Sequence, residues 1–473
     1  MRLPQVTVLS ESEVRAIDEA AVGLLGDVGL SMGSQKARDI LREAGADVHD
    51  EIVRFPERLV RNAVESAPRH FDIHDRRGSA TSTLGQSQPL VASGHNAVYV
   101  LDSAHGDRRP STKDDIGRFA RLSDALGEID VVGIQAMPQD VPPRSSLLHA
   151  ADACWRNSTK HLYFSPDAPD VAEAIIDMAE AVSAATVSET RNVICQLSPT
   201  SPLFWEAGAV EALMITAERG CPCCFLPEPF SGVTSPITLA GLITMNVAET
   251  LGGLTLQQSI QPGAPAVFGS AWTTFDMRAA NVLIAAPEPV LCRLAGAQMG
   301  RFYGLPTHSI GFDSDNHCYD EQMGMEKLAT TFAPLAAGID LVVNAGMFAT
   351  GLTVSLAQLV ADAETAGYLR RILRGIEVSE ETIGLDAVRR VGPRGNFMTD
   401  EHTLAHLRGG EHWEPSILCR ERYENWCDRA RADLLETADV RARQLLHEHS
   451  VEPLPEKTAA ELDGIIARFE AKL

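Results

Sequence analysis

The sequence predicts a (β/α)8 barrel, the TIM-barrel fold class, with an N-terminal helical elaboration and a C-terminal helical tail. Strand-length apolar runs alternate with helix-length amphipathic segments, and no nucleotide-binding GxGxxG motif follows the first run. Nearly continuous apolar strands separated by helices indicate a parallel sheet covered on both faces. A doubly wound open sheet is the alternative, and the number of β/α units, which approaches eight, favours the closed barrel.

Seven strand-like runs carry this prediction, and their spacing also divides the chain. We expect a mixed helical elaboration over residues 1–110, the barrel over 111–398 and a tail over 399–473 that packs on the barrel. The eighth strand is ambiguous between residues near 97–102 and a segment around 385–397. The seven runs are 131–138, 160–166, 192–199, 221–229, 265–272, 305–312 and 340–347.

Composition limits the function classes. The chain has 473 residues, of which 45% are hydrophobic, and a formal net charge of −23. Such an acidic surface repels phosphate backbones and anionic lipid, so neither nucleic acid nor a membrane is an expected partner. The N-terminus lacks the pattern of a secretory signal and no apolar run approaches the ~20 residues of a membrane span, so we expect a cytoplasmic protein.

The cysteine cluster at Cys221, Cys223 and Cys224 raises the question of a metal site. The three residues lie in the apolar run CPCCFLPEP, which is typical of a buried strand, and no second Cys/His pair stands at zinc spacing. We therefore expect reduced thiols and no metal.

Active-site residues of a barrel lie at the carboxyl ends of the strands and in the loops that follow. The polar segment GFDSDNHCYDEQMGMEK (311–327) follows an apolar run and precedes a helix, and its polar density exceeds what a turn needs. An exposed loop with an aspartate helix cap is the structural alternative. The residues alone thus predict a barrel enzyme with a site near 311–322.

Several segments together resemble the trimethylamine methyltransferase family. They include GLLGDVGLSMGSQKARDILREAGADVHDEIVRFPERLVRNAVESAP near the start and SPITLAGLITMNVAETLGG further on. They continue in SDNHCYDEQ, DAETAGYLRRILRGIEVSEET and GPRGNFMTDEHTL, so the resemblance covers nearly the whole chain.

This resemblance implies a TIM barrel that moves a methyl group from an amine to the cobalt of a separate corrinoid protein, with no cofactor bound permanently by the chain itself. Family members often carry lysine in a motif S-D-A-K-x-x-D-x-Q, near the position of pyrrolysine in archaeal relatives. In this sequence the motif spans Ser314 to Gln322, and His317 stands in the place of the lysine. Because a quaternary ammonium already has a good leaving group, the missing pyrrolysine favours a quaternary amine such as glycine betaine.

A quaternary cation favours aromatic faces and nearby carboxylates, although each aromatic residue at a strand end could equally serve barrel packing. We expect His317 and Asp315 to be catalytic, with the imidazole bonding a substrate carboxylate or carrying a proton. The substrate-binding candidates are Glu228, Phe230, Trp272, Phe312, Asp313, Tyr319 and Gln322.

Two other functions stay open at this point. A barrel demethylase or lyase could use another methyl acceptor, such as a folate, and a betaine-binding relative could have kept the fold and lost the chemistry. The sequence also leaves open whether the chain forms a homo-oligomer.

Overall fold

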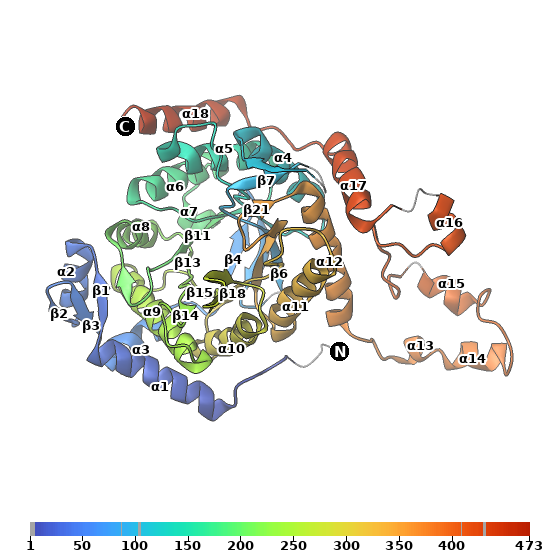
Figure 1. Ribbon diagram of the computed structural model, residues 1–473, viewed down its shortest axis with the longest axis horizontal. Coiled ribbons are helices and arrows are strands. Elements are labelled where there is room, and N and C mark those ends of the chain that lie inside the picture. Colours follow the sequence, from blue (N-terminus) through green and yellow to red (C-terminus); the bar gives the residue numbers. More distant parts are fainter. Residues whose placement is uncertain (1–4, 87, 103–105, 408, 429–431) are drawn as a thin grey trace.

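The computed structural model describes residues 5–86, 88–102, 106–407, 409–428 and 432–473, and its centre is a closed barrel of eight parallel strands (Figure 1). The strands follow one another around the barrel in chain order, and the last, β19, pairs with the first, β6. This closure confirms the predicted barrel and excludes the open sheet. The strands are β6 (Leu90–Ser93), β9 (Val131–Gly133), β10 (His161–Phe164), β11 (Val193–Leu197), β13 (Cys223–Phe225), β15 (Ala266–Ser270), β18 (Thr307–Ile310) and β19 (Leu341–Ala345).

Each of the seven predicted runs contains one of these strands, but the eighth strand lies at neither predicted place. It is β6, at residues 90–93, so the barrel begins before residue 111. Residues 99–101 do form a strand, β7, which belongs to a separate sheet of the order β20-β21-β7-β8. The sheet consists of β7 (Tyr99–Leu101), β8 (Arg108–Pro110), β20 (Met347–Phe348) and β21 (Thr353–Val354).

A ring of helices covers the outside of the barrel, one after each strand (Figure 1). The helix α9 is the longest of them, and its apolar sequence could cross a membrane by length and composition alone, but most of it is buried against the barrel and its neighbours. The helices are α4 (Lys113–Ala125), α5 (Ser146–Asn157), α6 (Pro169–Ser183), α8 (Ala207–Glu218), α9 (Leu239–Ile260), α10 (Pro287–Tyr303), α11 (Glu321–Ala337) and α12 (Leu356–Arg374). Two shorter helices, η1 (Pro143–Ser145) and α7 (Val187–Thr190), lie in the connections.

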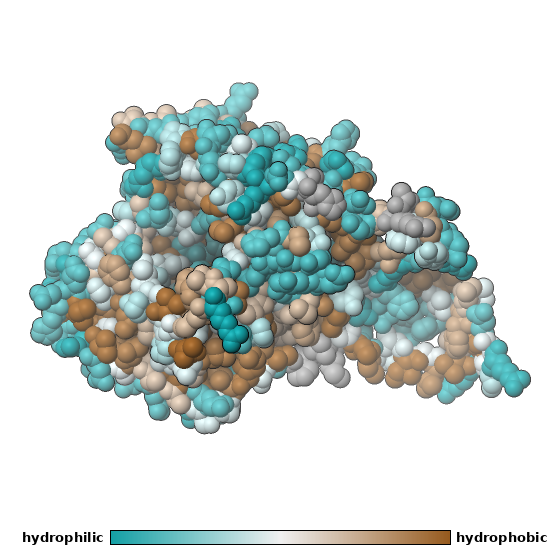
Figure 2. Space-filling view, in the orientation of Figure 1, coloured by the Kyte–Doolittle hydropathy of each residue, from teal (hydrophilic) through white to brown (hydrophobic). Residues whose placement is uncertain are grey.

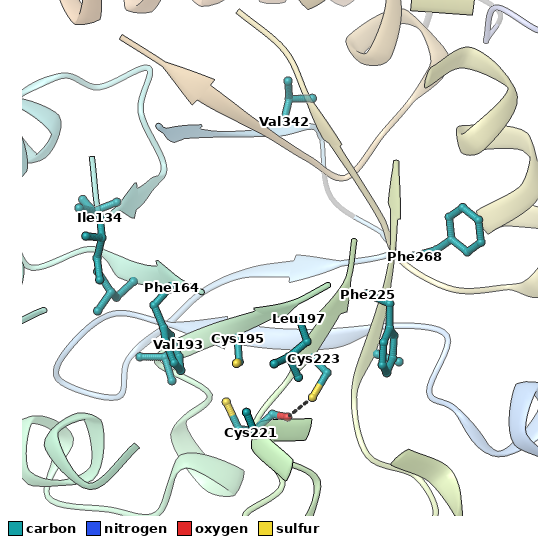
Figure 3. Packing of buried hydrophobic residues seen from close by; sticks show 14 of the residues in the cluster. Ile134, Phe164, Val193, Cys195, Leu197, Cys221, Cys223, Phe225, Phe268 and Val342 are labelled. Atoms are coloured by element: carbon teal, nitrogen blue, oxygen red, sulfur yellow. Dashed lines mark hydrogen bonds between the residues drawn. The ribbon is translucent and has the colours of Figure 1, made fainter. Parts of the chain in front are cut away.

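Side chains alternate along the barrel strands between the interior and the helices. On the helix side, Cys195, Leu197, Cys223 and Phe225 belong to one large apolar core with the helices (Figure 3). The cysteine cluster is therefore part of a buried strand, as expected, and burial raises the pKa of the Cys223 thiol to about 12.

The amino end of the barrel is closed by a hairpin of β4 (Phe71–His74) and β5 (Ala80–Leu84). Its side chains Phe71, Ile73 and Leu84 pack against interior residues of the barrel strands, such as Leu90 and Val131. The hairpin thus fills the barrel interior at its amino end.

The N-terminal elaboration packs on the outside of the barrel, mainly on α9. A small sheet of order β12-β1-β3-β2 links it to the loop after β11. The elaboration comprises α1 (Glu11–Asp27), β1 (Leu30–Met32), α2 (Gln35–Glu43), β2 (Asp47–His49), β3 (Ile52–Arg54) and α3 (Glu57–Ser66), and β12 (Phe204–Trp205) adds an edge strand to its sheet.

The C-terminal region has two parts. Helices α17 (Leu434–Glu448) and α18 (Glu456–Glu470) pack on the barrel helices α12 and α6, whereas the preceding segment projects away from the barrel (Figure 1). This projecting segment begins before residue 399, where the tail was expected to start. It carries α13 (Glu380–Ile383), α14 (Leu385–Val391), α15 (Glu401–Leu407) and α16 (Tyr423–Asp428).

Close packing of α9 on the barrel predicts a stability difference between two helical glycines. A Cβ at Gly253 would lie 2.6 Å from the Trp205 ring and 2.9 Å from the Phe225 ring, whereas a Cβ at Gly23 would meet nothing within 4 Å. We expect Gly253→Ala to lower the free energy of unfolding by about 1–3 kcal/mol. Gly23→Ala, the matched control, should raise it by up to about 1 kcal/mol, because alanine favours the helix. Denaturant titration measures both, and a neutral Gly253→Ala would contradict the described packing.

Candidate functional site

A layer of polar side chains crosses the barrel interior near the carboxyl ends of the strands. Tyr163 of β10 donates its hydroxyl proton to Gln196 of β11 at 2.5 Å and lies 3.0 Å from Nε2 of His308 on β18. The Tyr163 and His308 rings stack with centroids 5.4 Å apart and planes inclined by 5°. Burial lowers the pKa of His308 to about 3, so its imidazole is neutral and donates from Nε2 to the Tyr163 oxygen.

Glu228 follows β13 and lies beside this layer, close enough to Tyr163 and Asp313 for its charge to affect both. The Glu228 side chain has surface that solvent can reach, but many protein atoms lie around its carboxyl group. Loss of water around the carboxylate raises the pKa of Glu228 to about 7, and the negative charge of Asp313 adds to this rise. Glu228 is therefore a carboxyl group that changes charge near neutral pH and that a ligand can reach.

Asp313, by contrast, is fully enclosed and its charge is largely neutralised. Nη2 of the buried Arg293 on α10 lies 2.9 Å from Oδ2 of Asp313, and Asn344 donates to Oδ1 of Asp313 at 2.9 Å. Burial raises the pKa of Asp313 to about 6, and Arg293 acts against this rise. Asn344 sits at the end of β19 with φ +84°, a left-handed conformation that costs energy for a residue with a side chain.

His95, in the loop after β6, completes the group. Its ring meets the Tyr163 ring edge-on, with centroids 5.2 Å apart and planes inclined by 77°. Burial lowers the pKa of His95 to about 4, and the neighbouring side chains of Gln196 and Asn344 oppose this shift. The imidazole is therefore neutral at physiological pH.

We refer to Tyr163, Gln196, His308, His95, Glu228, Asp313 and Asn344 together as the central polar cluster. Within the described residues, Oδ1 of Asn344 has no hydrogen-bond donor, and neither has Oε1 of Gln135, which lies beside the same strand ends. Together with the Glu228 carboxylate, the cluster offers acceptor oxygens next to aromatic faces. Such surroundings suit a small cation.

The structure brings two of the predicted site residues, Glu228 and Asp313, into this cluster. Asp315, expected to be catalytic, instead accepts hydrogen bonds from the backbone N–H groups of Ile284 and Ala285, both at 3.0 Å. His317 lies on the exposed part of the loop after β18. Gln322 lies exposed in the first turn of α11 and donates to Glu326 at 2.8 Å. The role of His317 thus stays a prediction.

The four aromatic candidates pack within the barrel and its loops. Trp272 and Phe312 have no accessible surface, so neither can contact a substrate in this conformation. The Trp272 ring packs against α10, where a methyl group at Gly296 would come within 2.4 Å of it. Phe230 is half-buried in β14 (Phe230–Ser231), and the Tyr319 ring packs on Phe348 with centroids 5.3 Å apart. Barrel and loop packing, the alternative considered for these residues, accounts for their positions.

The short strand β14 belongs to a sheet beside the barrel mouth. It pairs in parallel with β16 (Thr273–Asp276), which pairs with β17 (Asn281–Leu283). The Asp315 carboxylate caps the turn after β17 and thereby links this sheet to the loop after β18.

A buried lysine fixes that loop from the other side. Nζ of Lys327 on α11 donates to the carbonyl oxygens of Phe312 and Met347 at 2.5 and 2.6 Å and lies 2.9 Å from the Asp362 carboxylate. One cation thus joins the segments that follow β18 and β19.

Sequence reasoning identified Gln196 as a strand-end candidate but missed His95, Tyr163, His308 and Arg293 as parts of the site. Polar residues at alternate positions of otherwise apolar strands, as in HLYF and THSI, were the available signal, because alternate positions of a barrel strand face the interior.

Other parts of the structure fit a small-molecule or metal site less well. A cavity of about 580 Å3 lies beside the end of α12 and is lined by Arg370, Arg371, Arg374, Leu407 and Trp413 among others. It adjoins the amino end of the barrel, opposite to where barrel enzymes act. In the described part of the chain, no three His, Cys, Asp or Glu side chains come together as a group that could hold a metal ion.

A closed (β/α)8 barrel with titratable groups gathered at the carboxyl ends of its strands defines the chain as a barrel enzyme by class. The family model for trimethylamine methyltransferase (MTTB) matches residues 1–473, so the chain belongs to the trimethylamine methyltransferase family and is a methyltransferase.

Curated relatives agree with this membership. The chain is 31% identical over 465 residues to the trimethylamine methyltransferase MttB of Desulfitobacterium hafniense (strain DSM 10664 / DCB-2), covering 98% of this chain and 93% of the relative. It is 29% identical over 472 residues to a glycine betaine methyltransferase of Desulfitobacterium hafniense (strain Y51), covering 98% of each. Among solved structures, the hydroxylamine complex of MtmB aligns over 99% of this chain and 96% of that one, with 13% identity and a TM-score of 0.49.

The ion pair beneath the loop after β18 predicts a large difference between two lysines. Lys327→Met should lower the free energy of unfolding by about 3–5 kcal/mol, because Asp362 would stay buried without its counter-charge. Lys36→Met breaks an exposed ion pair with Glu218, 3.1 Å long, and should cost about 1 kcal/mol at most. Thermal or denaturant unfolding of the two variants measures the difference. Equal losses of unfolding free energy in the two variants would show that Lys327 does not stabilise the loop after β18.

Proposed function

We propose that this chain takes a methyl group from a small quaternary amine, similar to glycine betaine, and transfers it to the cobalt of a separate corrinoid protein. Family membership supports methyl transfer, and the relatives include enzymes named for trimethylamine and for glycine betaine. The accessible carboxylate of Glu228 supports a cationic amine as the donor, and the leaving-group chemistry favours the quaternary form.

The observation that carries the proposal is the accessible carboxylate of Glu228. The Arg293 guanidinium compensates Asp313, whereas the structure gives no cation within salt-bridge distance of Glu228 among the described residues. An accessible, uncompensated carboxylate surrounded by protein attracts a cation more strongly than one in open water, because water screens its charge less. The neutral, half-buried His95 ring lies nearby, with its ring edge-on to Tyr163.

Methyl transfer from a quaternary amine needs no proton transfer at nitrogen. The carbon–nitrogen bond breaks, its electron pair stays on nitrogen, and a neutral tertiary amine leaves. The protein must therefore hold the cation, exclude water and aim one methyl group toward the open end of the barrel. Glu228 supplies the counter-charge, and the hairpin of β4 and β5 closes the other end.

Neutral trimethylamine would need more help, because loss of a methyl group would leave a dimethylamide anion. Its leaving group is poorer, and the loop that resembles the family motif contains His317 where relatives often have lysine. Among the described residues, no hydrogen-bond partner fixes the His317 side chain as a structural group, and His317 is exposed on the carboxyl side of the barrel. We propose that it contacts the carboxylate of a betaine-like substrate.

The methyl acceptor travels on its own protein, so we assign no residue of this chain to holding it. A corrinoid cobalt, when brought to the barrel mouth, supplies the electron pair that forms the new bond to carbon. An accessible Glu228 at the carboxyl end of β13 fits an acceptor that approaches from that side. The nine cysteines are free thiols, which agrees with a reducing compartment such as the cytoplasm.

Transfer can be tested directly with reduced free cobalamin and a panel of methylated amines. We expect methylated cobalamin, followed by its absorbance, to form with glycine betaine or a close relative and to form more slowly with trimethylamine. A clear preference for trimethylamine would contradict the quaternary donor. Binding without transfer, also in the presence of a corrinoid protein, would instead indicate a relative that has lost the chemistry.

Measurements of substrate affinity and of the thermal midpoint test the role of His317. His317→Ala should weaken substrate binding about ten- to a hundred-fold, the effect of losing one hydrogen bond to a charged group at about 1.5–3 kcal/mol, and should leave the thermal midpoint unchanged. His49→Ala, on an exposed strand of the N-terminal elaboration, is the matched control and should alter neither quantity.

The pH dependence of binding should report Glu228. Its pKa of about 7 means that the carboxylate forms as pH rises from 6 to 8, so a quaternary cation should bind about tenfold more tightly at pH 8 than at pH 6. Glu228→Gln should remove this dependence and weaken binding at pH 8 at least about tenfold, roughly 1.4 kcal/mol. Calorimetry with tetramethylammonium measures the effect, and exposed Glu321→Gln serves as control. A pH dependence that survives in Glu228→Gln would assign the cation to another group.

A further inference from the structure

The segment of residues 376–407 leaves the barrel after α12 and carries an unusual number of exposed apolar side chains. We call it the arm. It holds α13, α14 and α15, and Figure 2 shows hydrophobic atoms along its lower edge, on the right of the view. Nine large apolar residues of the arm are each at least 42% exposed: Ile376, Val378, Ile383, Leu385, Val388, Phe397, Met398, Leu404 and Leu407.

The arm has almost no core of its own. Neither α13 nor α15 buries a residue, and α14 buries only Ala387. Short helices without a buried face do not hold their shape in water, because packing supplies most of the stability of a helix. Apolar residues repeat at helical spacing in two of the helices, Leu385 with Val388 in α14 and Leu404 with Leu407 in α15. Each of these two helices therefore presents an exposed apolar face.

The base of the arm is nevertheless fixed on the barrel. The Arg371 side chain donates to the carbonyl oxygens of Gly375, at 3.1 Å, and of Glu411, at 2.7 Å. Where the chain returns, the Glu364 carboxylate accepts hydrogen bonds from the backbone N–H groups of Ser416 and Ile417 at 2.9 and 3.1 Å. The direction in which the arm projects is therefore set by α12.

A second apolar surface lies on the outer face of α11. Met325, Leu328 and Phe332 are exposed there and follow one another at spacings of three and four residues, while Lys327, Thr330 and Thr331 face inward. A barrel helix normally presents polar residues on this side. We call this stripe the wall.

We propose that the arm packs against the wall of a second copy of this chain, so that the protein is a homo-oligomer built on reciprocal arm-to-wall contacts. The nine arm residues expose on the order of 1,000 Å2, similar to the roughly 800 Å2 that each partner contributes to a standard interface. Patches this apolar are typical of permanent interfaces.

A second copy is the occupant that covers both surfaces at once. In a two-fold dimer each chain gives one arm and receives the other, so the two unpartnered surfaces of a single chain are buried by a single assembly. A different protein on the arm would leave the wall bare. A second copy is also present whenever the chain is synthesised. An arm without its own core needs a partner that is always present.

Sedimentation of the full chain at micromolar concentration tests the proposal. We expect the wild type to sediment as two or more chains of 51.0 kDa. The arm variant Leu385→Glu/Leu404→Glu and the wall variant Met325→Glu/Leu328→Glu should each sediment as single chains, because each places charge in an apolar contact. Val28→Glu changes an exposed apolar residue outside both surfaces and should leave the assembly intact.

Mixing the two variants then separates arm-to-wall packing from other arrangements. A mixed pair joins the intact arm of the wall variant to the intact wall of the arm variant, so an equal mixture should regain the mass of at least two chains. This recovery also shows that both variants are folded. A single-chain wild type, an arm variant that stays assembled or a mixture that stays monomeric would each overturn the proposal.

Discussion

The buried ion pair between Arg293 and Asp313 is the interaction on which the geometry of the site depends. It joins the helix α10 to the loop after β18, and Asn344 binds the same carboxylate from the end of β19. Charges without access to water must be paired, and the pairing holds three neighbouring β/α units in register. Because Asp313 is compensated in this way, the charge of Glu228 is left free at the accessible side of the barrel. The site thus contains one carboxylate committed to structure and one that a cation can reach.

The fold could be predicted largely from the sequence because barrel strands are short, apolar and regularly spaced. All seven predicted runs contain a strand of the barrel. The remaining strand, β6, has the sequence LVAS, and a second apolar run, AVYVLD, follows it within a few residues and competes with it for the eighth place. The neighbouring residues 99–101 have stronger β character, but they pair with β21 and β8 outside the barrel. Local preference identified a strand there, and only the closure of the barrel decides which strand takes the eighth place.

The site was less predictable, for two physical reasons. The rule that strand ends carry chemistry identified Glu228 and Asp313, but side-chain direction is no longer set by alternation once a strand has ended. Phe312, for example, adopts φ +52° directly after β18 and turns into the packing between barrel and α11. Conversely, Tyr163 and His308 lie within strands, where a sequence read on its own treats them as core. Their role follows only from the partners that the closed barrel brings across its interior.

The central claim is that Glu228 is the counter-charge for a cationic methyl donor, and its ionisation can be followed directly. A 13C NMR titration of carboxyl-labelled protein, with Glu228→Gln used to assign the signal, gives the pKa of this group with and without tetramethylammonium. A cation bound beside the carboxylate stabilises its charged form, so the account predicts a pKa near 7 in the free protein and a value at least about one unit lower when the site is saturated. A pKa that is the same in both titrations, with binding verified independently, would contradict the assignment of Glu228 as the cation site.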